Sequence, residues 1–161
     1  MYEITGFSAQ VSYEPAQMLF DPTPTQIRHE VSALAEELKT LPQVDLPVQH
    51  EFLDGVYMRT VFMAKDTIVI GKIHKQEHVA IISKGSATVL TEHGVIEIKA
   101  PFIFKSPPGA RRALRIHEDM VWTTVHRSDH KDLESLEEQL IAKDFDDPVL
   151  LELEQKARAL T

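Results

Sequence analysis

The sequence predicts a mainly β fold, a barrel or sandwich of short strands, with α-helices before and after it. Between residues 48 and 127, short runs of β-branched and aromatic residues alternate with turn residues at intervals of about ten residues. The segments on either side have the apolar period of amphipathic helices. A chain of 161 residues is most simply one structural domain with its own core.

The first segment, residues 1–47, is expected to form an arm followed by one helix. Residues 1–23 place large apolar side chains irregularly among polar ones, which fits an extended arm packed on the core or on a partner. Thr23 or Thr25 can cap a helix, and apolar residues recur at helical spacing from there. This pattern predicts an amphipathic helix over 26–40, with its apolar stripe on the barrel or on a neighbouring subunit.

The second segment, residues 48–127, is expected to contain the barrel strands. Lys84-Gly85 and Glu118-Asp119 are each expected to turn the chain between two short strands, and the second pair would join a hairpin. Pro107 to Gly109 is expected to form a rigid corner. The predicted strands cover residues 56–62, 67–70, 79–82, 87–90, 95–98, 102–104, 113–116 and 121–125.

The last segment, residues 128–161, returns to a helical period. Leu133, Leu136 and Leu140 form one apolar stripe, and a second stripe follows Pro148. We therefore expect one or two C-terminal helices that dock on the barrel or on another copy of the chain.

Composition excludes several classes of function. The formal net charge of −8 is opposite in sign to that of a general phosphate-backbone binder, so nucleic acid is not expected as a partner. The absence of cysteine excludes disulfides, thiolate metal sites and a cysteine nucleophile. No apolar run is long enough to span a membrane, and the N-terminus lacks the layout of a signal peptide, so we expect a cytoplasmic location.

The stretch 71–85 gathers residues that can bind a metal or transfer protons. His74 and His78 flank a predicted turn that also contains Glu77, with β-rich runs on both sides. Because both histidines belong to one turn, each can direct a ring nitrogen toward a common point beside an apolar barrel wall.

This stretch resembles the first motif of the cupin superfamily, whose members are double-stranded β-helix (jelly-roll) barrels. The motif is usually G-x5-H-x-H-x3,4-E-x6-G. Aligned on Gly85, its two histidine positions fall on Lys72 and His74, and its glutamate position falls on His78. Lys72 cannot ligate a divalent ion while it is protonated.

The second cupin motif, G-x5-P-x-G-x2-H-x3-N, is matched in part. Pro107 and Gly109 match its corner, and its histidine position falls on Arg112, which cannot ligate a metal. The resemblance covers residues 48–127, and the chain is also similar over 71–126 to cupin-like proteins encoded by tailed bacteriophages. The resemblance implies a cupin-type barrel over this range, and the helical periods on either side add flanking N- and C-terminal helices.

A metal site is the first of three interpretations of these residues. His74 and His78 need a third ligand, and His126 is the best candidate if the register of the hairpin at Glu118-Asp119 turns its ring inward. Three histidines with open coordination positions would suit zinc, iron, nickel or manganese. Glu77 could add an oxygen ligand or act as a catalytic base.

The second interpretation is a metal-free receptor for a small polar or anionic molecule, such as a carboxylate, a sugar acid or a phosphate. Arg112 would supply a planar fork for an oxyanion, and Lys72 a second cation. Tyr57 could reach the cavity as an acid or base, and Trp122 could stack on a ligand. Packing in the core is the alternative role for both aromatic side chains.

The third interpretation is a non-catalytic structural or interaction protein, in which these polar groups only hydrogen-bond within the barrel. The apolar arm and helix stripes favour self-association, most simply as a homodimer. The cupin resemblance allows isomerase, lyase or oxygenase chemistry, but a fold does not determine a function. The sequence alone leaves open whether the chain catalyses a reaction.

Overall fold

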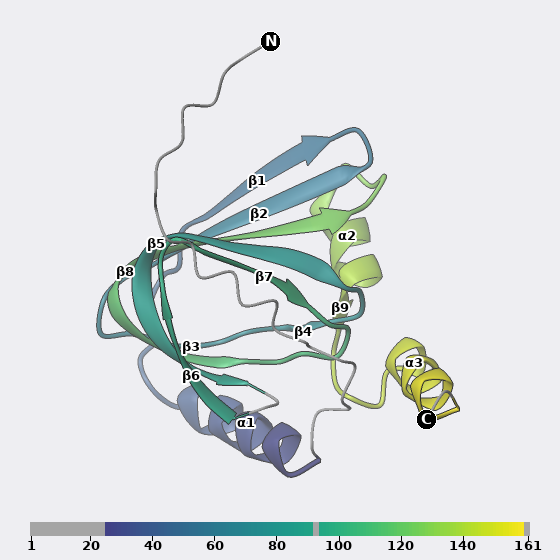
Figure 1. The fold of residues 1–161 in the computed structure, drawn as a ribbon, viewed down its shortest axis with the longest axis horizontal. Coiled ribbons are helices and arrows are strands. Elements are labelled where there is room, and N and C mark those ends of the chain that lie inside the picture. The colour runs from purple at the N-terminus through teal and green to yellow at the C-terminus, as the bar shows by residue number, and fades with distance from the viewer. Residues whose placement is uncertain (1–24, 92–93, 160–161) are drawn as a thin grey trace.

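The computed structural model describes residues 25–91 and 94–159, so the predicted arm over 1–23 lies outside the described residues. The strands form two layers that meet at one end and separate at the other (Figure 1). The predicted mainly β fold, with helices before and after the strands, is confirmed. The elements in chain order are α1 Thr25–Leu38, β1 Val48–Leu53, β2 Val56–Met63, β3 Ile68–Ile70, β4 Ile73–His74, β5 His78–Thr91, β6 Gly94–Lys99, β7 Phe102–Ser106, β8 Ala113–Arg127, α2 Leu133–Leu140, β9 Ile141–Ala142 and α3 Pro148–Arg158.

Two long strands, β5 and β8, pair with each other through both layers. The larger sheet has the order β1-β2-β8-β5-β6, with β3 also paired to β8 and β7 also paired to β5. The first half of β5 pairs with β7 and with the second half of β8. The second half of β5 pairs with β6 and with the first half of β8. All of these pairs are antiparallel, and a smaller antiparallel sheet joins β4 to β9.

The predicted turns at Lys84-Gly85 and Glu118-Asp119 are wrong, because each pair lies inside one long strand. The pairing register of β5 and β8 shifts near Gly85, and both strands bend there from one layer into the other (Figure 1). Gly85 has a φ of +91°, and a Cβ at this position would lie 2.5 Å from the Asp119 carbonyl oxygen. In a sequence, a glycine or a pair of adjacent polar residues usually indicates a turn. The same residue types also occur at a bulge within a continuous strand, which is where they lie here.

The core lies between the two layers, near this bend. Its largest fully buried aliphatic side chains are Ile82 and Val89 from β5, and Ile116 and Met120 from β8. Because successive side chains of a strand point to opposite faces, each long strand contributes to the core on both sides of its bend. Aliphatic packing therefore holds the layers together where they meet.

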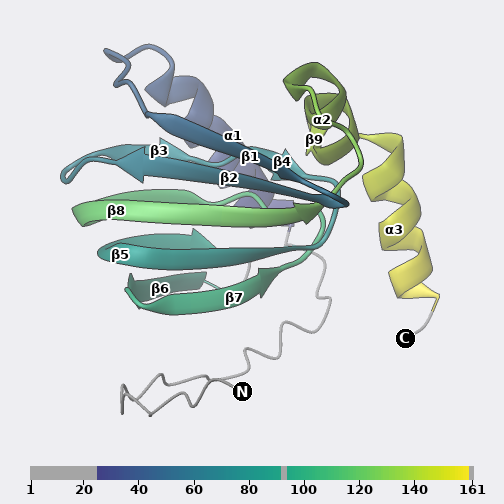
Figure 2. The same ribbon diagram turned by 90° about the horizontal axis from the view of Figure 1, so that it is seen from above.

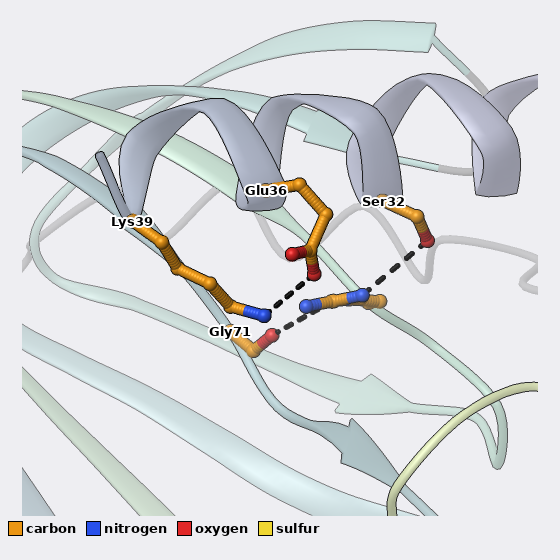
Figure 3. A network of polar contacts seen from close by, with 5 residues as sticks. Ser32, Glu36, Lys39 and Gly71 are labelled. Atoms are coloured by element: carbon orange, nitrogen blue, oxygen red, sulfur yellow. Dashed lines mark hydrogen bonds and ion pairs between the residues drawn. The ribbon is translucent and has the colours of Figure 1, made fainter. Parts of the chain in front are cut away.

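Helix α1 packs on the barrel of its own chain, since Val31 and Ala35 are buried. Arg111, which precedes β8, links the helix to the strands: its Nε donates to the Gly71 carbonyl and its Nη1 to Ser32 Oγ, both at 3.3 Å. Figure 3 shows Ser32 on the face of α1 that is directed toward Gly71. These contacts fix α1 next to the link between β3 and β4.

The C-terminal elements lie at the end where the layers separate. Figure 2 shows α2 at one end of the strands and α3 beyond that end. Leu136 and Leu140 of α2 pack against Tyr57 of β2, and the Lys75 backbone N–H donates to the Leu140 carbonyl at 2.8 Å. The pairing of β9 with β4 then places His74 opposite Ile141. The segment after the barrel therefore positions a residue of the predicted site.

Helix α3 is joined to α1 by an ion pair between Arg28 Nη2 and Glu154 Oε1 at 2.5 Å. The Arg28 guanidinium also lies over the Phe145 ring, 4.7 Å from its centroid. Within the described ranges, no helix has the length and apolar character needed to cross a bilayer.

We predict that Gly85→Ala destabilises the fold by roughly 2 kcal/mol or more, because the methyl group adds a backbone clash to an unfavourable φ. Gly94→Ala is the matched control: Gly94 also has a positive φ, of +108°, but nothing lies within 4 Å of its added Cβ. We expect this control to cost about 1 kcal/mol. Urea unfolding measures both, and equal losses would contradict the role assigned to the bend.

Candidate metal and ligand site

Three histidines from three strands come together where the layers separate. His74 lies in β4, His78 begins β5 and His126 lies in β8. The ring centroids are 4.2 Å apart for His74 and His78, 4.6 Å for His78 and His126, and 5.1 Å for His74 and His126. One ring nitrogen of each residue lies within 4.8 Å of the others. These three nitrogens therefore form a group that could hold one metal ion.

The strand pairings explain this convergence. His126 is paired with Tyr57 of β2, and His78 with Ser106 of β7. Both histidines therefore lie in the layer formed by β1, β2, β7, the first half of β5 and the second half of β8. His74 approaches from the other side, held by β9 and by its own carbonyl, which accepts from the Gly109 N–H at 2.8 Å. His126 lines the cavity beside the other two histidines, although the hairpin on whose register its direction was expected to depend is absent.

The hydrogen bonds of the rings leave nitrogen lone pairs for another partner. His78 Nδ1 lies 3.2 Å from the Gln76 carbonyl oxygen. Because a carbonyl can only accept, this nitrogen carries the proton and His78 Nε2 presents its lone pair. Nδ1 of His74 and Nδ1 of His126 are buried without a hydrogen-bond partner among the described residues. An unsatisfied buried polar atom costs free energy, and a bound metal ion would remove that cost at a ring nitrogen.

All three imidazoles are neutral at pH 7. Burial is the main cause: it lowers the pKa of His74 to about 2, of His126 to about 3 and of His78 to about 4. The neighbouring histidines and Arg59 add to the effect at His74 and His126. At His78 the Gln76 carbonyl opposes it. Since metals bind the neutral ring, the site is in its ligating form at physiological pH.

The histidines line a cavity of about 460 Å³ between the layers. One end is polar and contains the three histidines together with His50, Tyr57, Arg59 and Arg112. The other end is lined mainly by aliphatic and aromatic side chains of both layers, namely Leu46, Val48, Val61, Met63, Val69, Leu114 and Trp122. Residues of α2 and Ile141 cover the polar end.

Arginine and lysine side chains make the polar end cationic. Arg112 is only 8% exposed, and its Nη1 donates to Ser106 Oγ at 2.7 Å. Arg59 is half-buried, and burial is the main cause of its lowered pKa. Lys72 lies at the rim, where it forms an ion pair with Glu137 of α2. In this part of the cavity, one carboxylate faces three basic side chains, so an anion is favoured there.

Of the other predicted site residues, Tyr57 and Trp122 line the cavity, whereas Glu77 lies outside it. Tyr57 is buried, with its ring 6.0 Å from the His126 ring, and Trp122 packs edge-on against Phe104. Glu77, the predicted catalytic base, is exposed, and its carboxylate pairs with Lys105 Nζ at 2.9 Å. A base at Glu77 would face solvent and not the histidines.

The sequence analysis did not predict two residues of the cavity, His50 and Arg59. His50 Nδ1 is hydrogen-bonded to the Tyr57 hydroxyl at 2.7 Å, and Arg59 lies opposite His50 across the β1–β2 pair. The signal was the two-residue alternation of a strand, which puts Arg59 on the same face as Tyr57 and Val61. To predict that His50 lies in the cavity, the pairing register of β1 and β2 must also be known, and the sequence does not reveal that register.

Comparison with known proteins identifies neighbours in the cupin superfamily. No protein-family model and no curated protein sequence matches this chain. A cupin superfamily protein from Desulfitobacterium hafniense is 12% identical, with a TM-score of 0.46, over 55% of this chain and 83% of that one. An RmlC-like cupin family protein with a double-stranded β-helix fold, from Methanocaldococcus jannaschii, is 14% identical, with a TM-score of 0.44, over 53% and 82%. A cupin domain from Bordetella pertussis is 9% identical, with a TM-score of 0.43, over 55% and 98%. Likenesses this distant support no conclusion about ligand, metal or activity.

We predict that the metal-free protein loses stability as the pH falls from 7 toward 5. Below pH 6.5 the unfolded chain binds protons at His74, His78 and His126, whereas the folded chain does not until about pH 4 or lower. Each buried histidine therefore costs up to roughly 1.4 kcal/mol per pH unit in this window. Urea unfolding in the presence of a chelator measures the slope.

The variant His126→Gln should flatten this pH dependence, because it removes one of the groups that titrate only in the unfolded chain. His29→Gln, at an exposed position on α1, should leave the slope unchanged. A slope equally steep in His126→Gln and in the wild type would show that the buried histidines do not cause it.

Proposed function

We propose that this protein binds a divalent transition metal through His74, His78 and His126, and a small anionic molecule beside it in the cavity. The observation that supports this most is the convergence of three neutral imidazoles from three strands, two of them buried and His74 half-buried, with one nitrogen of each within 4.8 Å of the others. A purely structural role would not require two of these rings to leave a buried Nδ1 without a hydrogen bond, as His74 and His126 do among the described residues.

The donor set suits zinc, iron, nickel or manganese. Three neutral imidazoles leave at least one coordination position open, as in catalytic metal sites. Such a metal, when bound, acts as a Lewis acid toward an oxygen atom that reaches the open position. The Gln76 carbonyl orients the His78 ring for ligation, and α2 and β9 cover the site and limit access of water.

The cavity supports the anion part of the proposal. Arg59 and Arg112 lie on the same polar end as the histidines, and Arg112 is fixed by Ser106. Guanidinium groups match the geometry of oxyanions and are stronger partners in a partly buried site than at the surface. Tyr57 adds a hydroxyl group that is oriented by His50.

Elemental analysis of protein purified without a histidine tag and loaded with zinc tests the metal site. We expect stoichiometric metal in the wild type, and affinities at least about 100-fold weaker in His74→Ala, His78→Ala and His126→Ala, since loss of an outer-shell partner alone costs 10–100-fold. His117→Ala, a half-exposed histidine on the outside of β8, is the matched control and should retain the metal. Absence of metal from the loaded wild type would refute the proposal.

A non-catalytic oligomeric structural or interaction protein, encoded by a phage, is the second candidate. One observation favours it: a row of uncharged side chains crosses the outer face of the layer that contains β2, β7, the first half of β5 and the second half of β8. Thr60, Thr123, Ile81 and Ile103 are neighbours across β2, β8, β5 and β7, and Ile103 is 51% exposed. Two copies of a chain with a net charge of −8 repel each other least across such a face.

If two copies pair through this face, the wild type will have a mass in solution of twice 18.3 kDa by light scattering. Ile103→Glu should then give the monomer, because it buries two like charges against each other. Val95→Glu, at a 66% exposed position on β6 in the other layer, should leave the dimer intact. A monomeric wild type at micromolar concentration would exclude this candidate.

A further inference from the structure

The two ends of the cavity differ in chemistry, and this difference restricts the class of molecule that fits. At the apolar end, Val61, Met63 and Leu114 are buried, and Trp122 presents its ring beside them. A polyhydroxylated ligand would lose its hydrogen bonds to water there without replacing them, since the lining consists of aliphatic side chains, the Met63 thioether and one indole ring.

The polar end offers a place for one compact oxyanion. The half-buried Arg59 guanidinium lines the cavity and forms no hydrogen bond or ion pair among the described residues, although the Glu137 carboxylate acts on its charge through space. Lys72, by contrast, already has Glu137 as its partner. A planar carboxylate can receive two parallel hydrogen bonds from one guanidinium, which a point charge cannot supply.

We propose that the cavity takes a carboxylate with an apolar body: its head lies at Arg59 beside the three histidines, and its body packs against Trp122. This inference specifies the class of anion in the proposed function. It rests on the proposed function for the metal ion beside the carboxylate. A volume of about 460 Å³ is within the range of small-molecule pockets and accommodates a single aromatic ring with a short acid chain. Sugar acids are excluded by the apolar end.

Trp122 is the only tryptophan of the chain, so its fluorescence reports occupancy of the apolar end. The probes are phenylacetate, its neutral near-isostere phenylacetamide, and gluconate, which has the same head on a polyhydroxylated body. We expect phenylacetate to bind to the zinc-loaded protein at least about 10-fold more tightly than either of the other two. Equal binding of phenylacetate and phenylacetamide, or tighter binding of gluconate, would overturn the proposal.

Variants at Arg59 test the position of the head. Arg59→Gln should remove the preference for phenylacetate over phenylacetamide, and Arg59→Lys, which keeps the charge but loses the fork, should restore only part of it. Arg115→Gln, an exposed arginine on the outer side of β8, is the matched control and should bind like the wild type. An unchanged preference in Arg59→Gln would contradict the assignment. Circular dichroism shows whether each variant is folded.

Titrations with and without zinc separate this inference from the metal site. If zinc binds but phenylacetate gives no response in either state, the ligand class is wrong and the metal site stands. If phenylacetate binds with the same Arg59 dependence while zinc does not bind, the ligand class is supported and the metal site is wrong.

Discussion

The bend that β5 and β8 share is the constraint on which the rest of the structure depends. The two strands pair along most of their length and change layer at the same place, where Gly85 lies against the backbone of residues 118–120. Two side-chain contacts hold the outside of the bend: Ser86 Oγ donates to Glu118 at 2.7 Å, and Asp119 accepts from the Lys65 N–H at 3.0 Å. Close to the bend the layers touch and form the core, and farther away they separate and leave a cavity.

The charge distribution of the chain changes between its surface and this cavity. The protein is acidic overall, but the polar end of the cavity combines two arginines with three imidazoles that burial keeps neutral. Keeping such groups out of water costs stability, and folded proteins concentrate costs of this kind at sites of function. Because neutral imidazoles carry no charge, they can lie next to Arg59 and Arg112 without strong repulsion.

The sequence predicted the fold and most of the site for reasons that the structure makes clear. His126 faces inward because alternate residues of β8 do so from Met120 onward, which is the same alternation that a three-residue turn would give. Glu77 immediately precedes His78, the first residue of β5. Because neighbouring side chains of extended backbone point to opposite faces, the inward direction of His78 leaves Glu77 exposed to solvent. His50 could not be predicted, because its place depends on which strand lies beside β1, and pairing between segments is not encoded in any local pattern.

The pairing of β4 with β9 places His74 opposite Ile141, sixty-seven positions later in the chain. During synthesis, a nascent polypeptide that has just completed β8 already possesses His78 and His126, but not the strand that holds His74. The three imidazoles can be fixed in place only after the segment following the barrel has left the ribosome. Completion of this centre therefore requires synthesis of β9, and a product that stops before Ile141 would lack the strand that pairs with His74.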